Sequence, residues 1–112
     1  MQYFHNPRCQ KSREGLQLLK DKGLDPEIIL YMTEPLSPMA LEDVLTKLDM
    51  DAEDLIRTKE KVWKEEFKDK ELSEDELILA MIEYPQLMER PIFINGEKAA
   101  IGRPAENLLD IL

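Results

Sequence analysis

The 112-residue chain contains a single cysteine, Cys9, and a single histidine, His5. A lone cysteine cannot form an internal disulfide, so the fold is not held together by one. One cysteine and one histidine are also too few for a zinc site, which takes three or four such ligands. We therefore expect no bound metal, and Cys9 is either a packing residue or a reactive thiol.

Basic side chains and long apolar runs are scarce. The chain has 15 Lys and Arg against 24 Asp and Glu, which gives a net charge of −9. This balance speaks against nucleic acid and anionic membranes as partners, because both bind basic surfaces. No apolar run approaches the ~20 residues of a membrane-spanning helix, and the first residues do not resemble a signal peptide. We expect a soluble, cytoplasmic protein.

Arginine is the rarer of the two basic residues, with five against ten lysines. Its rigid fork of donors suits oxyanions, which a lysine ammonium matches less well. Two of the arginines flank Cys9 and two stand in Arg-Pro dipeptides. On number alone, structural ion pairs on an acidic protein would explain them as well. The five are Arg8, Arg13, Arg57, Arg90 and Arg103.

The apolar pattern predicts a strand, a helix and a strand, then several helices, then two strands and a helix. The second strand is apolar almost throughout, which is typical of a buried parallel strand. Trp63 and Phe67 lie one helical turn apart in the charge-rich stretch 58–72, where core packing is expected before an exposed partner patch. The expected elements are strands at 2–4 and 27–31 around a helix at 11–22; helices from Ser37-Pro38, near 51–57, and from the capping box 73–76 to Pro85; and a hairpin over 91–101, with its turn at Asn95-Gly96, before a helix from Pro104.

This order predicts an α/β fold of the thioredoxin-like type, with a βαβ…ββα mixed sheet and an inserted helical subdomain. We expect a single domain over 1–112, in which 1–33 and 89–112 form the core and 34–88 the insertion. Cys9 would then stand between the first strand and the first helix. Pro91 would occupy the place where such folds carry a cis-proline facing the active site, although a proline that merely begins a strand is common.

The surroundings of Cys9 favour a thiolate. The free amide groups of a helix N-terminus stabilise negative charge, and Arg8, Lys11 and Arg13 add positive charge nearby. His5 is close enough in sequence to help polarise the thiol. Cysteines in such places can have pKa values well below the free value of ~8.5, and the same N-terminus can receive an oxyanion. These features alone leave a reactive and a structural cysteine equally supported.

Spacing removes two kinds of thiol enzyme. A thioredoxin dithiol requires Cys-x-x-Cys, but the residue three positions after Cys9, where the second cysteine would be, is Ser12. A cysteine phosphatase loop requires Cys-x5-Arg, but Gly15 stands where the arginine would be. The chain has Cys-x3-Arg, formed by Cys9 and Arg13.

The stretch 5–13, HNPRCQKSR, resembles the active-site loop of the glutaredoxin-coupled arsenate reductase family, whose usual form is H-N-P-x-C-x-x-S-R. The segments 55–57 (LIR), 90–92 (RPI) and 101–106 (IGRPAE) resemble further motifs of that family. The order and spacing of these segments match over essentially the whole chain. Their coincidence, more than any one of them, carries the resemblance.

The resemblance implies a catalytic pair, in which Cys9 is the nucleophile and His5 helps to lower its pKa. It implies that the arsenate oxyanion is bound by Arg57, Arg90 and Arg103. It implies that the loop is shaped by Asn6, Ser12, Arg13 and Pro91. Arsenate and glutathione would be substrates, glutaredoxin would regenerate the thiol, and no tightly bound cofactor is expected.

Two other functions stay open from the sequence. One is a glutathione-dependent thiol oxidoreductase with another substrate. The other is a redox-responsive regulator that binds RNA polymerase; related regulators typically switch through Cys-x-x-Cys, and Ser12 replaces the second cysteine here.

Overall fold

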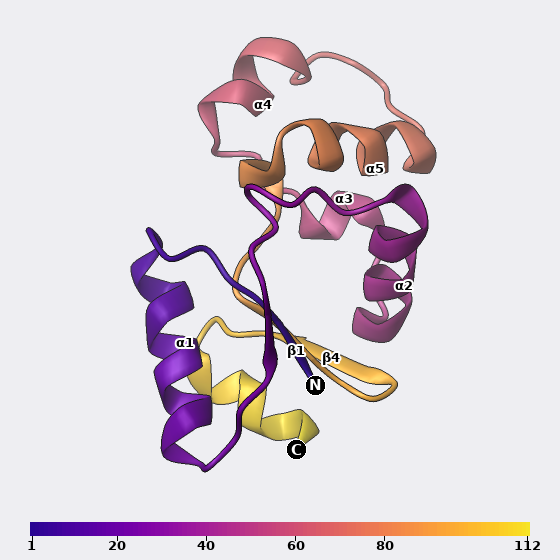
Figure 1. The fold of residues 1–112 in the computed structure, drawn as a ribbon. Helices are drawn as coiled ribbons and strands as arrows, with labels where there is room; N and C mark the ends of the chain where they lie inside the picture. Colours follow the sequence, from indigo (N-terminus) through magenta and orange to yellow (C-terminus); the bar gives the residue numbers. More distant parts are fainter. The chain divides into compact units, whose positions relative to one another are not determined.

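A computed structural model describes residues 1–112, which divide into two units. The first comprises Met1–Glu34 and Arg90–Leu112, and the second comprises Pro35–Glu89. These limits lie within one residue of the expected core and helical insertion. The indigo and yellow ends of the chain meet in the first unit, which contains the sheet (Figure 1). No helix in the chain has the length and apolar character needed to cross a membrane.

The first unit is built on a mixed four-stranded sheet, in agreement with the predicted α/β fold. The strands lie in the order β2-β1-β3-β4. β1 pairs in parallel with β2 and antiparallel with β3, which forms a hairpin with β4. Gly96 has φ +65° in the hairpin turn, the conformation for which the Asn-Gly pair was expected. The elements are β1 (Gln2–Phe4), α1 (Gln10–Asp21), β2 (Glu27–Ile29), β3 (Ile92–Asn95), β4 (Lys98–Ile101) and the 3₁₀ helix η2 (Ala105–Ile111).

β2 corrects one expectation. The sequence predicted a buried strand over 27–31, but β2 ends at Ile29 and lies at the edge of the sheet, paired only with β1. Ile28 is 39% exposed as a result. The apolar run therefore predicted the presence of a strand correctly, but not its position at the edge of the sheet. The run continues into a turn, in which Tyr31 is buried.

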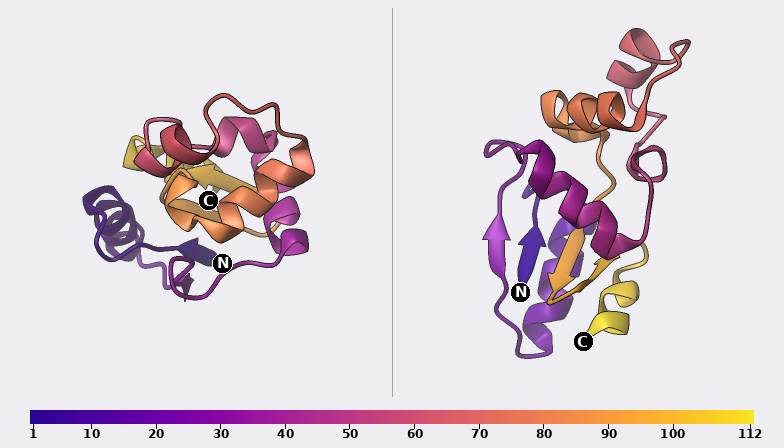
Figure 2. Two further views of the ribbon diagram at one scale, coloured as in Figure 1. Left: turned by 90° about the horizontal axis from the view of Figure 1, so that it is seen from above. Right: turned by 90° about the vertical axis from the view of Figure 1, so that its right-hand side faces the viewer.

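The core of the first unit lies between one face of the sheet and the helices α1 and η2. Tyr3 and Phe93 are opposite one another on β1 and β3, and they pack with Leu19 of α1 and Leu108 of η2. α1 lies behind the strands in the right-hand view of Figure 2, and η2 contacts both α1 and β4. The final segment, expected as a helix from Pro104, takes the tighter 3₁₀ form from Ala105.

Gly15 allows α1 to approach the sheet closely. A Cβ atom at this position would lie 2.5 Å from Tyr3 Oη and 3.0 Å from Leu108 Cδ1. The Tyr3 hydroxyl cannot move aside freely, because it donates a hydrogen bond to the Ser12 carbonyl at 2.7 Å. The missing side chain is thus required by packing.

The second unit is helical, as expected. Ser37 Oγ accepts from the Ala40 amide, and the predicted capping box of Ser73 and Glu76 is present in both directions. The segment expected to be helical near 51–57 is shorter, because Ile56 is extended and pairs with Met88 in an antiparallel bridge. Its elements are α2 (Pro38–Leu48), α3 (Ala52–Leu55), α4 (Lys61–Glu66), α5 (Glu74–Glu83) and the 3₁₀ helix η1 (Pro85–Leu87).

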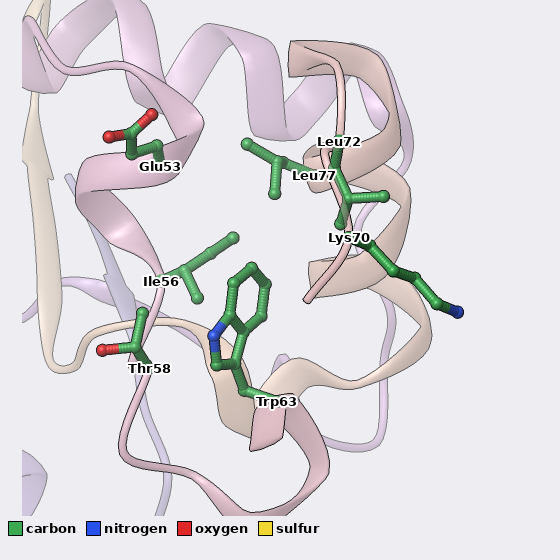
Figure 3. Close-up of a pocket in the computed structure, with 7 residues that line it drawn as sticks. All are labelled: Glu53, Ile56, Thr58, Trp63, Lys70, Leu72 and Leu77. Atoms are coloured by element: carbon green, nitrogen blue, oxygen red, sulfur yellow. The ribbon is translucent and has the colours of Figure 1, made fainter. Parts of the chain in front are cut away.

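Trp63 and Phe67 are half-buried in the second unit, with ring centroids 5.6 Å apart. The indole of Trp63 faces a pocket of about 260 Å³, together with Ile56 and Leu77 (Figure 3). The pocket lining contains none of the predicted site residues. It consists of Glu53, Ile56, Thr58, Trp63, Lys70, Leu72 and Leu77.

The Gly15→Ala variant tests the close packing of α1. Helix propensity alone would make alanine stabilising by ~0.5–1 kcal/mol, whereas overpacking against Tyr3 costs about 1–3 kcal/mol. We expect a net loss in the free energy of unfolding, measured by urea denaturation. Gln17→Ala, at an exposed position of the same helix, should change it by less than about 0.5 kcal/mol. A Gly15→Ala variant more stable than wild type would contradict this packing.

Candidate active site

Cys9 is the N-cap residue of α1, a helix of 12 residues. Its own backbone amide donates to the Asn6 carbonyl at 2.9 Å, and its carbonyl accepts from the Arg13 amide at 3.0 Å. The side chain is half-buried and makes no capping hydrogen bond, but the backbone amides of Ser12 and Lys11 act to lower the pKa of its thiol. The predicted position between the first strand and the first helix is therefore the observed one.

Ser12 joins this loop to the sheet and to the helix. Its side chain is fully buried, and Oγ accepts from the Asn6 amide at 3.0 Å. The same oxygen lies 2.7 Å from His5 Nδ1. The Ser12 carbonyl receives the Tyr3 hydroxyl. One small polar residue thus fixes both ends of the segment that carries Cys9.

The outer side of the loop is closed by two shorter interactions. Arg13 Nη1 donates to the Pro7 carbonyl at 2.8 Å. Asn6 Oδ1 accepts from the Arg8 amide at 3.1 Å. Asn6 and Arg13 therefore contact the loop backbone, which is the position expected for residues that shape it.

Arg90 and Arg103 join Cys9 within the first unit. The Arg90 side chain hydrogen-bonds the Cys9 sulfur. Arg90 lies two residues before the start of β3, and its peptide bond to Pro91 is cis. Arg103 Nε donates to the Arg90 carbonyl at 2.7 Å, so the second guanidinium is anchored beside the first.

Two opposing effects determine the pKa of the Cys9 thiol. Partial burial raises it, because a thiolate loses solvation. The hydrogen bond and positive charge of Arg90, with the amides of Ser12 and Lys11, outweigh burial, and the net pKa is lowered. Negative charge on this sulfur is therefore favoured by a guanidinium and by a helix N-terminus.

His5 lies in this site through Ser12. Burial lowers its pKa, and the positive charges of Lys20 and Arg13 lower it further, so the ring is mainly neutral near pH 7. Its hydrogen-bond partner is the Ser12 hydroxyl, whereas the groups that lower the Cys9 pKa are Arg90 and backbone amides. The geometry places His5 as a support of the loop.

Arg57 belongs to the second unit. Its backbone amide donates to the Leu87 carbonyl at 2.7 Å, and its Nη1 lies 3.5 Å from Glu60 Oε1. It follows the end of α3 by two residues, so the arginine is carried by an extended segment rather than by the expected helix. Its predicted part in oxyanion binding stays a prediction.

Tyr31 is a candidate that the sequence analysis missed. Its side chain is 2% exposed, and its hydroxyl has no hydrogen-bond partner. Burial raises its pKa to about 12; Arg90 and Arg103 oppose this rise, while Cys9 adds to it. Its place at the end of the predicted second strand was the available signal, because parallel strands end at the same edge of a sheet.

The donor-rich groups of this site suit an anion. Arg90, Arg103 and the first amides of α1 can only donate hydrogen bonds. No cluster of three or more His, Cys, Asp or Glu side chains in residues 1–112 could hold a metal ion.

The arrangement has a counterpart in a known family. Residues 4–111 match the ArsC family. The chain is a member of the ArsC family. The loop of Cys9, the cis-proline segment and the Gly102-Arg103-Pro104 segment all lie within the matched region.

Relatives of this ArsC-family chain are similar to it in sequence and in structure over nearly its full length. An arsenate reductase of Haemophilus influenzae is 46% identical, covering 97% of this chain and 96% of the relative. The uncharacterized protein YfgD of Escherichia coli K12 is 50% identical, covering 97% and 93%. The solved structure of an arsenate reductase from Vibrio cholerae has a TM-score of 0.94 at 40% identity, covering 100% and 98%. These neighbours confirm the thioredoxin-like ArsC fold.

The Arg90→Met variant tests the control of the Cys9 pKa. Without the guanidinium, burial is no longer outweighed, so we expect the pKa of Cys9 to rise. Because only the thiolate is alkylated, the rate of reaction with iodoacetamide should then increase at a higher pH than in wild type. Arg8→Met removes an exposed charge from the same loop and should leave the profile nearly unchanged. Coincident profiles for Arg90→Met and wild type would refute the role of Arg90.

Proposed function

We propose that this protein is a glutathione- and glutaredoxin-dependent arsenate reductase with Cys9 as its nucleophile. The observation that carries the proposal is a single cysteine at a helix N-terminus, whose sulfur is hydrogen-bonded by Arg90 and whose pKa is lowered. Support comes from the relatives named arsenate reductase, at 40–46% identity over nearly the full chain.

The first step is attack of the Cys9 thiolate on arsenic. A sulfur–arsenic bond forms, an arsenic–oxygen bond breaks, and the oxygen leaves as water after taking up protons from solvent. Arsenic is still in oxidation state V in this adduct. The oxygens that remain are held by the guanidinium groups of Arg90 and Arg103 and by the amides at the head of α1. Arg57 would supply a third guanidinium.

The second step requires an external thiol, because the chain has no other cysteine. A glutathione thiolate attacks the Cys9 sulfur, and a disulfide forms between them. The electron pair of the broken sulfur–arsenic bond passes to arsenic, which leaves as arsenite in oxidation state III. Glutaredoxin then reduces the mixed disulfide by thiol–disulfide exchange and restores Cys9. The two electrons come from thiols, so no tightly bound cofactor is needed.

The remaining predicted residues support this chemistry. His5 and Ser12 hold the segment before and after Cys9, and Asn6 and Arg13 close the loop. Pro91 directly follows Arg90, and it is buried next to the start of β3. In the proposed cycle these groups hold the side chains of Cys9 and Arg90 in fixed positions relative to one another while bonds to arsenic form and break.

The direct test is a coupled assay with arsenate, glutathione, glutaredoxin, NADPH and glutathione reductase. We expect arsenate-dependent loss of NADPH with wild type and background loss with Cys9→Ser, because a serine hydroxyl is not ionised at neutral pH. Omitting arsenate controls for unrelated oxidation of glutathione.

Two results would contradict the proposal. One is the absence of arsenate-dependent turnover by folded wild-type protein. The other is equal turnover by wild type and Cys9→Ser. Cys9-dependent turnover of a disulfide substrate without any turnover of arsenate would instead favour a thiol oxidoreductase of another substrate.

Arginine-to-lysine variants test oxyanion binding. Arg57→Lys, Arg90→Lys and Arg103→Lys each keep the charge but lose the planar fork. We expect the KM for arsenate to rise roughly tenfold or more, the equivalent of losing one hydrogen bond to a charged group. Arg8→Lys serves as the control and should leave KM unchanged. An unchanged KM in one of the three variants would remove that arginine from the proposed site.

A further inference from the structure

Tyr31 lies at the same edge of the sheet as the Cys9 loop. It follows β2 by two residues, and β2 runs parallel to β1, which leads into the loop. The His5 amide donates to the Ile29 carbonyl at 2.9 Å, so the two chains stay paired just beyond the strands. Position in the fold thus brings a tyrosine to the beginning of the segment that carries the thiol.

The Tyr31 hydroxyl is an exception among buried polar groups. The side chain is 2% exposed, and the oxygen has no hydrogen-bond partner. Buried hydroxyls in native proteins are nearly always satisfied, so an unsatisfied one calls for an explanation. An acceptor that arrives with a ligand would supply the missing partner.

The charges around Tyr31 are those of the candidate active site. The side chains that act electrostatically on its phenol are Arg90, Cys9 and Arg103. Burial and negative charge on Cys9 both disfavour a phenolate, so the phenol of Tyr31 keeps its proton, whereas the pKa of the Cys9 thiol is lowered. Tyr31 is therefore a neutral O–H donor beside two guanidinium groups and a thiol whose pKa is lowered.

We propose that Tyr31 is a substrate-contacting residue, whose phenolic O–H donates a hydrogen bond to an oxygen of the oxyanion that Cys9 attacks and that Arg90 and Arg103 bind. The inference rests on the proposed function. It adds a neutral hydrogen-bond donor to a site whose other side-chain donors are charged guanidinium groups. Tyr31 transfers no proton in this role. A phenol so reluctant to ionise is a poor general acid near neutral pH, but it remains a good hydrogen-bond donor.

The Tyr31→Phe variant separates this role from a structural one. The free protein loses no hydrogen bond, so its urea midpoint should equal or exceed that of wild type. Binding is measured as the arsenate concentration that half-protects Cys9 from iodoacetamide in the absence of glutathione. We expect this concentration to rise about tenfold or more, and kcat/KM to fall by a similar factor, because a donor to a charged group is lost. Tyr84→Phe, which alters a tyrosine of the second unit, should match wild type in all three measurements.

The outcomes are distinguishable. Weaker protection with an unchanged or higher midpoint supports the inference. Equal protection and equal kcat/KM for Tyr31→Phe and wild type would overturn it while leaving the proposed function intact. A lower midpoint with unchanged protection would also overturn it, since the hydroxyl would then serve the fold. If arsenate neither protects Cys9 nor is turned over in wild type, the proposed function fails and the inference fails with it.

Discussion

The hydrogen bond from Arg90 to the Cys9 sulfur is the interaction on which this site depends. Burial of the thiol opposes ionisation, and the guanidinium reverses that effect with help from two backbone amides. Both influences are needed for the proposed chemistry. A partly desolvated thiolate is a good nucleophile, and the cation that stabilises it can pass its hydrogen bonds to the oxygens of an incoming anion.

The fold brings these two residues together from opposite ends of the chain. β1 and β3 are antiparallel neighbours in the sheet, so the loop after β1 and Arg90, two residues before β3, lie at the same edge. Pro91 packs closely against Gly102. A Cβ atom at position 102 would lie 2.8 Å from Cγ of the Pro91 ring. The buried Ser12 hydroxyl fixes the loop on the other side. Small residues at close approaches and one buried polar link thus keep the thiol and the guanidinium in place.

Local signals in the sequence predicted much of the fold. The Asn95-Gly96 turn and the Ser73 capping box act over a few residues, and both are present as predicted. Features that depend on distant partners were less accessible. Nothing local shows that β2 has only one neighbour. The bridge from Ile56 to Met88, which ends the helical segment before Arg57, joins residues 32 positions apart.

The candidate active site likewise combines residues that local sequence signals predicted with one that depends on distant contacts. Cys9, Arg90 and Arg103 were predicted from residue type and motif, and the first unit brings them together. Tyr31 was missed because its significance lies in a buried hydroxyl without a partner, which only three-dimensional packing reveals.

The central claim is that arsenate makes Cys9 the target of an external thiol. Intact-protein mass spectrometry after incubation with arsenate and reduced glutathione, without glutaredoxin, tests it most directly. The account predicts a single glutathione adduct at Cys9 that forms only when both reagents are present. No adduct, or an adduct that forms equally without arsenate, would contradict it.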